Sequence, residues 1–236
     1  MSYSHRNAPN CDWCAHKKNC FYDLLGDREA KKAWREIRLA NDFKRGEAIF
    51  HEGATAQGVY IVCTGAVKIY KSSGRTGQQL TTRVESPGDL LGHVAWLADE
   101  GPYTGTGEAL KPSMVSLIDA ATFRDFLTRY PAGAAALMKE LSRDVRRGEN
   151  KARDIAFKPA HGRLADTLLR MMVPRKPHPV VSGIKRQDLA ELAGLTIETT
   201  VRLLKAFETR ALLRKKEKDL VIRDEARLRS IADSAF

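Results

Sequence analysis

"RQDLAELAGLTIETTVRLLKAF", residues 186–207, predicts two helices joined by a sharp turn. Residues 188–193 have apolar positions at helical spacing, and Gly194 stands where the chain must change direction. Thr196 is a natural N-cap for the second helix, with Thr199 three residues further on. This is the anatomy of a helix-turn-helix, whose second helix lies in the major groove of DNA.

Glu198 and Arg202 are four residues apart and therefore share one face of the second helix. Glu can accept a hydrogen bond from cytosine N4, and Arg can bind guanine O6 and N7 in bidentate fashion. Near the start of a recognition helix the pair favours base reading, and an ion pair in solvent is the alternative. We expect the packed side of this helix to consist of Val201, Leu203, Leu204 and Phe207.

The next segment, "ALLRKKEKDLVI" (residues 211–222), predicts two short strands around a charged hairpin, or wing. Residues 159–236 carry 16 Lys and Arg against 10 Asp and Glu, and the whole chain has a formal net charge of +11. Such an excess of positive charge favours an anionic partner, and nucleic acid is the first candidate. The lysines of the hairpin suit phosphates. The residues expected to contact DNA are Thr196, Glu198, Thr199, Val201, Arg202, Lys205, Lys215 and Lys216.

Ahead of this segment, from Asp42 to about Asp119, short β-rich runs alternate with Gly and Pro. Runs such as "GEAIFHEG", "GVYIVCTGAVKIYKSSG" and "SMVSLID" predict a small all-β barrel or roll. No apolar run is long enough to span a membrane, and the N-terminus lacks a signal-peptide core. We therefore expect a cytoplasmic protein.

Residues 131–158 predict a long helix with an apolar residue at alternating intervals of three and four. Because charged residues flank this seam, we interpret it as a dimerisation helix. An amphipathic helix that packs on its own domain is the alternative. The seam is weak at its small residues, so a dimer formed by it would be marginal and switchable. Its members are Met138, Leu141, Val145, Gly148, Ala152 and Ile155.

The N-terminal stretch "CDWCAHKKNC", residues 11–20, contains three of the four cysteines of the chain. In the cytoplasm, clustered cysteines are more often metal ligands or redox centres than disulfides. Zinc and iron–sulfur sites usually need four ligands. Lys17 and Lys18 beside the cysteines would lower the pKa of the thiols. The candidates for the fourth ligand are Cys63, a carboxylate such as Asp119 or Asp12, His16, or no protein ligand at all.

The order of β-roll, long heptad helix and winged helix-turn-helix resembles the cyclic-AMP-receptor/FNR superfamily of bacterial transcription regulators. The motifs that carry this resemblance are "GVYIVCTGAVKIY", "PGDLLG" and "DLAELAGLTIETTVRLLKAF". The spacing of Cys11, Cys14 and Cys20 is similar to that of the FNR branch. In that branch three such cysteines and one in the roll bind a [4Fe–4S] cluster that favours the dimer. Oxygen degrades the cluster and releases DNA.

The resemblance implies an α+β fold in four parts. These are a cysteine-rich arm (1–22), a sensory β-roll domain (23–130), a dimerisation helix (131–158) and a winged helix-turn-helix domain (159–236). It also implies a homodimer that activates transcription from a TTGAT-like inverted repeat in double-stranded DNA, with RNA polymerase as a further partner. The implied cofactor is a [4Fe–4S] cluster, or alternatively zinc, with the ligands Cys11, Cys14, Cys20 and Cys63.

The chain departs from the family at three places. The family's fourth cysteine lies in the strand that matches "SMVSLID", where this chain has Ser116, and Cys63 lies in a different strand. The recognition motif Glu-x-x-Ser-Arg has Val201 in place of Ser. The Gly-Glu and Pro-Arg of the cyclic-AMP branch are replaced by Gly92-His93 and Pro102-Tyr103, which removes the cationic partner of a cyclic phosphate.

Two other functions compete with an iron–sulfur regulator. The first is a protein in which zinc only stabilises the N-terminal arm and the roll binds a small ligand other than cyclic AMP. The second is a redox enzyme, and it is the weakest because the chain has no Gly-rich dinucleotide loop after a strand and no further cysteine set. We therefore do not expect an enzyme.

Overall fold

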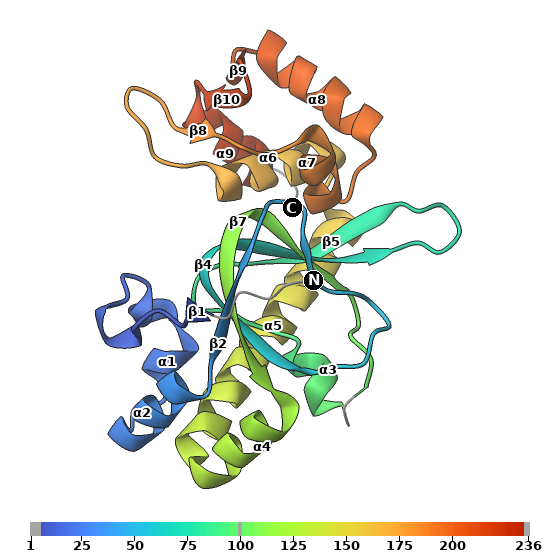
Figure 1. The fold of residues 1–236 in the computed structure, drawn as a ribbon. Coiled ribbons are helices and arrows are strands. Elements are labelled where there is room, and N and C mark those ends of the chain that lie inside the picture. The colour runs from blue at the N-terminus through green and yellow to red at the C-terminus, as the bar shows by residue number, and fades with distance from the viewer. Residues whose placement is uncertain (1–5, 99–100, 234–236) are drawn as a thin grey trace. The chain divides into compact units, whose positions relative to one another are not determined.

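The computed structural model describes residues 6–98 and 101–233 (Figure 1). The chain forms two compact units: one comprises residues up to 147 except 78–81, and the other comprises residues 78–81 and everything from 148 onward. Among the described residues, no helix is long and apolar enough to cross a membrane.

The first unit is built on a seven-stranded sheet, which confirms the predicted roll. Its main path runs β1-β2-β7-β4-β5, while β3 pairs with β7 and β6 pairs with β4. The β-rich region begins at Leu39, three residues before the predicted start at Asp42. The strands are β1 (Arg6–Asn7), β2 (Leu39–Phe43), β3 (Ala48–Phe50), β4 (Gly58–Ser72), β5 (Gln79–Glu85), β6 (Leu90–Leu91) and β7 (Thr106–Asp119).

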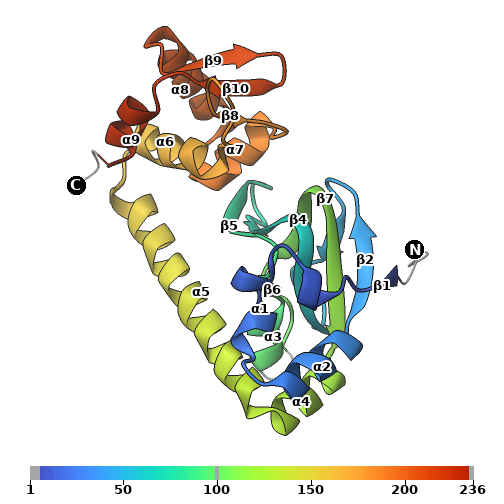
Figure 2. The same ribbon diagram turned by 90° about the vertical axis from the view of Figure 1, so that its left-hand side faces the viewer.

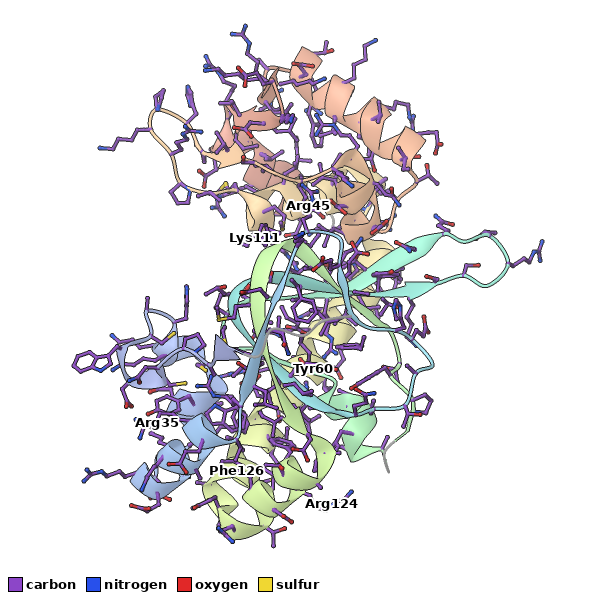
Figure 3. The ribbon with its side chains drawn as sticks, viewed as in Figure 1. Arg35, Arg45, Tyr60, Lys111, Arg124 and Phe126 are labelled. Carbon is purple, nitrogen blue, oxygen red and sulfur yellow. The ribbon has the colours of Figure 1, made fainter. Side chains whose placement is uncertain are left out.

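Strand β4 separates two apolar cores because successive side chains of a strand point to opposite faces. Val59 and Ile61 pack into one core. Tyr60 and Val62 pack into the other, which also contains Phe50 and Tyr103. Tyr60 is labelled within the roll in Figure 3. The near-continuous apolar run of this strand is therefore explained by burial on both sides.

The helices of the first unit surround the core that contains Val59 and Ile61. Trp34 is fully buried there, with its ring centroid 4.7 Å from that of Phe21 and 5.4 Å from that of Phe126. Asp27 caps α2 by accepting hydrogen bonds from the backbone N–H groups of Glu29 and Ala30. These helices are α1 (Phe21–Leu24), α2 (Arg28–Glu36), α3 (His93–Leu97) and α4 (Ala120–Arg129), together with the first part of α5 (Pro131–Phe157).

Helix α5 is one uninterrupted helix of 27 residues (Figure 2). Its predicted seam is not buried against the rest of the chain: Met138 is 63% exposed and Val145 is 58% exposed. Gly148, Ala152 and Ile155 are exposed as well, and Leu141 is half-buried. This exposure argues against the alternative of a helix that packs its apolar stripe on its own domain.

The second unit contains the predicted helix-turn-helix and wing. Its three-stranded sheet has the order β8-β10-β9, and Leu189, Leu204, Phe207 and Leu220 lie in its apolar core. Strand β8 and helix α9 were not predicted from the sequence. The elements are α6 (Ala160–Met171), β8 (Val180–Val181), α7 (Arg186–Ala193), α8 (Ile197–Thr209), β9 (Leu213–Lys216), β10 (Asp219–Ile222) and α9 (Glu225–Asp233).

Candidate functional site

The N-terminal cysteines lie on a series of tight turns ahead of α1. The backbone N–H of Cys14 donates to the carbonyl of Cys11 at 3.3 Å, and that of Cys20 donates to the carbonyl of Lys17 at 3.1 Å. Cys20 then caps α1, since its Sγ accepts from the backbone N–H of Tyr22 at 3.4 Å. These hydrogen bonds fold residues 11–20 into a series of short turns.

All four cysteines of the chain line one pocket in the first unit. Cys11, Cys14 and Cys20 enter it from the loop, and Cys63 enters it from β4. Cys11 is buried and the other three are half-buried. The pocket, including space open to solvent, has a volume of about 340 Å³. The structure thus brings together the four residues predicted to hold a metal or cluster.

Cys63 lies directly beside Ser116, the residue at which the family resemblance places the fourth cysteine. The two residues belong to the paired strands β4 and β7, and Cys63 Sγ is 3.2 Å from Ser116 Oγ. Ser116 is fully buried. A cysteine at position 116 would therefore place its sulfur close to that of Cys63, although Ser116 itself does not line the pocket.

The other candidates for a fourth ligand differ in their surroundings. The Asp12 carboxylate accepts hydrogen bonds from the Tyr22 hydroxyl and the Arg35 guanidinium (Arg35 is labelled in Figure 3), and it does not line the pocket. Asp119 Oδ1 caps α4 by accepting from the backbone N–H of Thr122 at 2.9 Å. His16 is exposed but does line the pocket. Cys63 and His16 are therefore the two candidates that face the other thiols.

Burial dominates the electrostatics of the thiols. It raises the pKa of Cys20 to about 12, and it also raises the pKa of Cys11 and Cys63. The positive charge of Arg38 acts in the opposite direction on all three thiols. A group that binds these sulfurs as thiolates must therefore displace their protons.

Arg38 was not among the site residues expected from the sequence, yet its side chain lines the pocket and is only 6% exposed. Of the cations expected there, Lys17 also lines the pocket and Lys18 does not, and both are exposed; Lys17 Nζ donates to the carbonyl of Asp12 at 3.2 Å. Arginines are common in charged segments such as "REAKKAWREIRL" (residues 28–39), so the sequence offered no signal that separates Arg38 from its neighbours.

The chemistry of the donor set fits an iron–sulfur cluster. Four thiolates are the usual ligands of a [4Fe–4S] cluster, with one thiolate on each iron. Among the residues that the structure describes, no three His, Cys, Asp or Glu side chains are grouped closely enough to hold a single metal ion. A zinc ion, with Zn–S distances of about 2.3 Å, would require its ligands to lie closer together than this.

The second site is the exposed face of α8. Gly194 ends α7 in a left-handed conformation with φ of 63°, which only glycine adopts without strain. Thr196 caps α8, its Oγ1 accepting from the backbone N–H of Thr199 at 3.2 Å. Both predictions for the turn are confirmed.

Glu198, Arg202 and Lys205 are exposed on α8. Within the described residues neither Glu198 nor Arg202 forms an ion pair, so the alternative of a helical ion pair between them is not supported. Hydrogen bonds to its own backbone N–H and from Thr196 lower the pKa of Glu198, which keeps it an acceptor at neutral pH.

The assignment of Val201 to the packed side of α8 was wrong. Its side chain is 49% exposed, while Leu204 and Phe207 are buried and Leu203 is partly buried. Val201 follows the exposed Glu198 by three residues, and residues three apart lie on the same face of a helix. It therefore belongs with the expected DNA-contacting residues.

The wing consists of β9 and β10, joined by a turn at Glu217 and Lys218. Lys215 and Lys216 are exposed at its end. Glu208 Oε1 accepts from the backbone N–H of Lys215 at 3.0 Å, which fixes the wing to the end of α8. The predicted wing is confirmed, and its lysines remain predicted phosphate contacts.

The positions that differ from the cyclic-AMP branch are occupied by packed side chains. Tyr103 is buried, its ring lies 4.2 Å from that of Phe50, and its hydroxyl donates to the carbonyl of Gly58 at 3.2 Å. His93 is buried, with Nε2 3.1 Å from Asp144 Oδ2 on α5.

Asp144 and Glu85 form an ionic cluster between the roll and the first part of α5. Arg83 pairs with Asp144, and Arg147 Nη1 lies 3.0 Å from Glu85 Oε2. Burial raises the pKa of Glu85 to about 8 despite these arginines. Burial also acts to raise the pKa of Asp144, but His93 and Arg83 outweigh it and hold that pKa low.

Two families match the chain. The cyclic nucleotide-binding domain family matches residues 40–130, and the Crp-like helix-turn-helix domain family matches residues 162–231. These matches cover the roll and the winged helix-turn-helix.

Curated relatives come from two groups of regulators. The CRP-like cAMP-activated global transcriptional regulator of Mycobacterium tuberculosis is 28% identical over 192 residues, covering 79% of this chain and 85% of the relative. The fumarate and nitrate reduction regulatory protein of Vibrio cholerae is 25% identical over 230 residues, covering 95% of this chain and 91% of the relative. Because the second match leaves only about a twentieth of the chain uncovered, it includes most of the cysteine segment.

Solved structures share the fold. FixK2 from Bradyrhizobium japonicum matches with a TM-score of 0.71 and 24% identity, covering 83% of this chain and 97% of that chain. The regulator CLP from Xanthomonas campestris matches with a TM-score of 0.75 and 19% identity, covering 83% of this chain and 99% of that chain.

Proposed function

Since the chain belongs to the CRP/FNR family of DNA-binding transcription regulators, we propose that an iron–sulfur cluster in the thiol pocket controls its binding to DNA. Cys11, Cys14, Cys20 and Cys63 hold a [4Fe–4S] cluster, and its loss in oxygen lowers the affinity for DNA. One observation carries the proposal: every cysteine of the chain faces the same pocket. The long match to the fumarate and nitrate reduction regulators supports it.

The residues around the pocket explain how such a group would act on the rest of the protein. Three thiols belong to a short arm and the fourth to a strand of the sheet, so a group bound by all four ties the arm to the roll. Cys11 also lies in the same apolar core as Trp34, Phe126 and Leu137, and Leu137 belongs to α5. The bound cluster would supply an oxygen-sensitive connection between the arm and the roll. The apolar core then connects the arm to α5, which carries the exposed seam.

The DNA-binding step requires two copies of the chain. Family members act as DNA-binding dimers, and the exposed seam of α5 provides an interface for this chain. Two α8 helices then read an inverted repeat whose half-site centres lie about one helical turn apart. Each half-site resembles TTGAT, with Glu198 and Arg202 at a G·C pair. Val201 offers methyl groups to a thymine where the family motif has a hydroxyl. The DNA-bound dimer contacts RNA polymerase and acts as an activator.

The test is purification without oxygen. We expect about four iron and four sulfide per chain, absorbance near 400 nm, and specific DNA binding that falls when air is admitted. Cys14→Ala should lose the colour and the iron. Stoichiometric zinc without iron, or DNA binding indifferent to air, would contradict the proposal.

Zinc is the second candidate, because His16 lines the same pocket as the cysteines. A Cys3His zinc site would stabilise the arm and leave the protein colourless. His16→Ala separates the two cases: it should release zinc from such a site and leave an iron–sulfur cluster held by four cysteines unchanged.

A further inference from the structure

Arg38 is a buried cation without a carboxylate partner. Its Nε donates to the carbonyl of Trp34 at 3.2 Å, and its Nη2 donates to the carbonyl of Pro9 at 3.0 Å. Its Nη1 lies 3.8 Å from Cys63 Sγ. Among the described residues it forms no ion pair, although its side chain is only 6% exposed.

Other buried cations of this chain do have carboxylate partners. Lys68 is 3% exposed and lies 3.5 Å from Glu108, and Lys158 is 9% exposed and lies 4.0 Å from Asp166. A buried charge is costly unless an opposite charge compensates it, and two carbonyl groups compensate a guanidinium only in part. The location of Arg38, on the wall of the thiol pocket, indicates where the missing negative charge belongs.

We propose that Arg38 is the counter-ion of the thiolate-bound group in this pocket, an inference that rests on the proposed function. Four thiolates around a [4Fe–4S]²⁺ core leave a net charge of −2, and three thiolates around Zn²⁺ in a Cys3His site leave −1, so the bound group is negative in both cases. Arg38 offsets part of that charge from within the protein, where solvent screening is weak. The exposed Lys17 and Lys18 are screened by water and salt and contribute less.

The contacts of Arg38 also make it a positioning residue. It joins the carbonyl of Pro9, just ahead of Cys11, to the carbonyl of Trp34 on α2, and it faces Cys63 on β4. The same side chain therefore contacts both parts of the protein that supply thiols.

A counter-ion and a purely structural link predict opposite effects in the metal-free protein. If Arg38 compensates the negative charge of the bound group, its own positive charge has no partner when the pocket is empty. Arg38→Met, which keeps the apolar stem, should then leave the metal-free protein equally stable or more stable. If Arg38 only ties the arm to α2 through hydrogen bonds, Arg38→Met should destabilise the metal-free protein as much as the loaded one.

The experiment compares wild type, Arg38→Met and the charge-preserving control Arg38→Lys under anaerobic conditions. Two quantities are measured: the thermal midpoint of the metal-free protein, and the rate at which the reconstituted protein releases iron to a chelator. We expect Arg38→Met to keep the metal-free midpoint and to release iron about tenfold faster or more, since a charge at this distance shifts thiolate equilibria by about that factor. Arg38→Lys should stay within about threefold of wild type.

Two results would overturn the inference: an equal loss of stability in the metal-free and loaded Arg38→Met proteins, or equal release rates for the Met and Lys variants. If wild type takes up no cluster, the proposed function fails, and the same series loaded with Zn²⁺ measures the role of Arg38. If wild type retains neither iron nor zinc, the proposal that Arg38 is a counter-ion is overturned as well.

Discussion

Replacing Gly148 by leucine should strengthen the dimer without help from the N-terminal site. Gly148 lies on the seam of α5, and a Cβ built on it meets no atom within 4 Å. The larger side chain therefore fits the monomer without a clash. In the dimer, two leucines would meet at a point of the seam where two glycines bury almost nothing.

The magnitude follows from the buried surface. A fully buried leucine contributes about 1.5–3 kcal/mol, so the pair contributes roughly 3–6 kcal/mol. At about 1.4 kcal/mol per factor of ten, the dimer dissociation constant should fall by roughly 10²- to 10⁴-fold. Gly148→Ala removes the helix-destabilising glycine but adds only one methyl group per chain, so it should tighten the dimer by about tenfold.

Sedimentation equilibrium of the metal-free protein measures these constants. Asn150→Leu is the matched control, because residue 150 is exposed and lies on the opposite side of the heptad from the seam. It should leave the dimer constant unchanged. The reasoning is refuted if Gly148→Leu dissociates like wild type, or if Asn150→Leu strengthens the dimer to the same degree.

The remaining predictions concern DNA reading and pH. Arg202→Ala should cost about 1–3 kcal/mol per half-site and relax the preference at the guanine in titrations on a randomised-site library; equal weakening of every sequence would make Arg202 a phosphate contact. Lys216→Ala should weaken all sequences similarly and lower the salt dependence of binding by about one phosphate contact. Burial raises the pKa of Glu85 from its ordinary value of 4.5 to about 8. The folded protein then keeps a proton that the unfolded chain has released, so this group lowers the free energy of unfolding by roughly 2–5 kcal/mol as pH rises from 4.5 to 8. Glu85→Gln should flatten that dependence in denaturant unfolding at pH 5 and pH 8, and an unchanged slope would exclude Glu85 as its source.

Features that depend on local signals could be predicted from the sequence. The cap at Thr196 and the left-handed turn at Gly194 depend on residues within a few positions of one another. The same is true of the alternation of glycines and apolar runs that predicted the roll. The exposure of Val201 was missed because several neighbours are apolar, and the sequence alone did not decide which of them faces the core.

Features that depend on long-range register could not be predicted. Cys63 and Ser116 are 53 positions apart, and only the pairing of β4 with β7 brings Sγ and Oγ to 3.2 Å. Arg38 follows α2 in the chain and contacts both the Pro9 carbonyl of the arm and Cys63 on β4, which no spacing in the sequence reveals. The four cysteines of the pocket could thus be expected from the sequence, whereas the proximity of Cys63 to Ser116 and the buried charge of Arg38 required the structure.

The measurement that tests the central claim most directly is an exchange of the fourth ligand between the two paired strands. Wild type, Cys63→Ala and the double variant Cys63→Ala/Ser116→Cys are reconstituted without oxygen and compared by iron content and by absorbance near 400 nm. We predict that Cys63→Ala loses most of the cluster and that the double variant regains it, because Ser116 Oγ lies only 3.2 Å from Cys63 Sγ on the paired strand. A spectrum and an iron content that Cys63→Ala leaves unchanged would contradict the account.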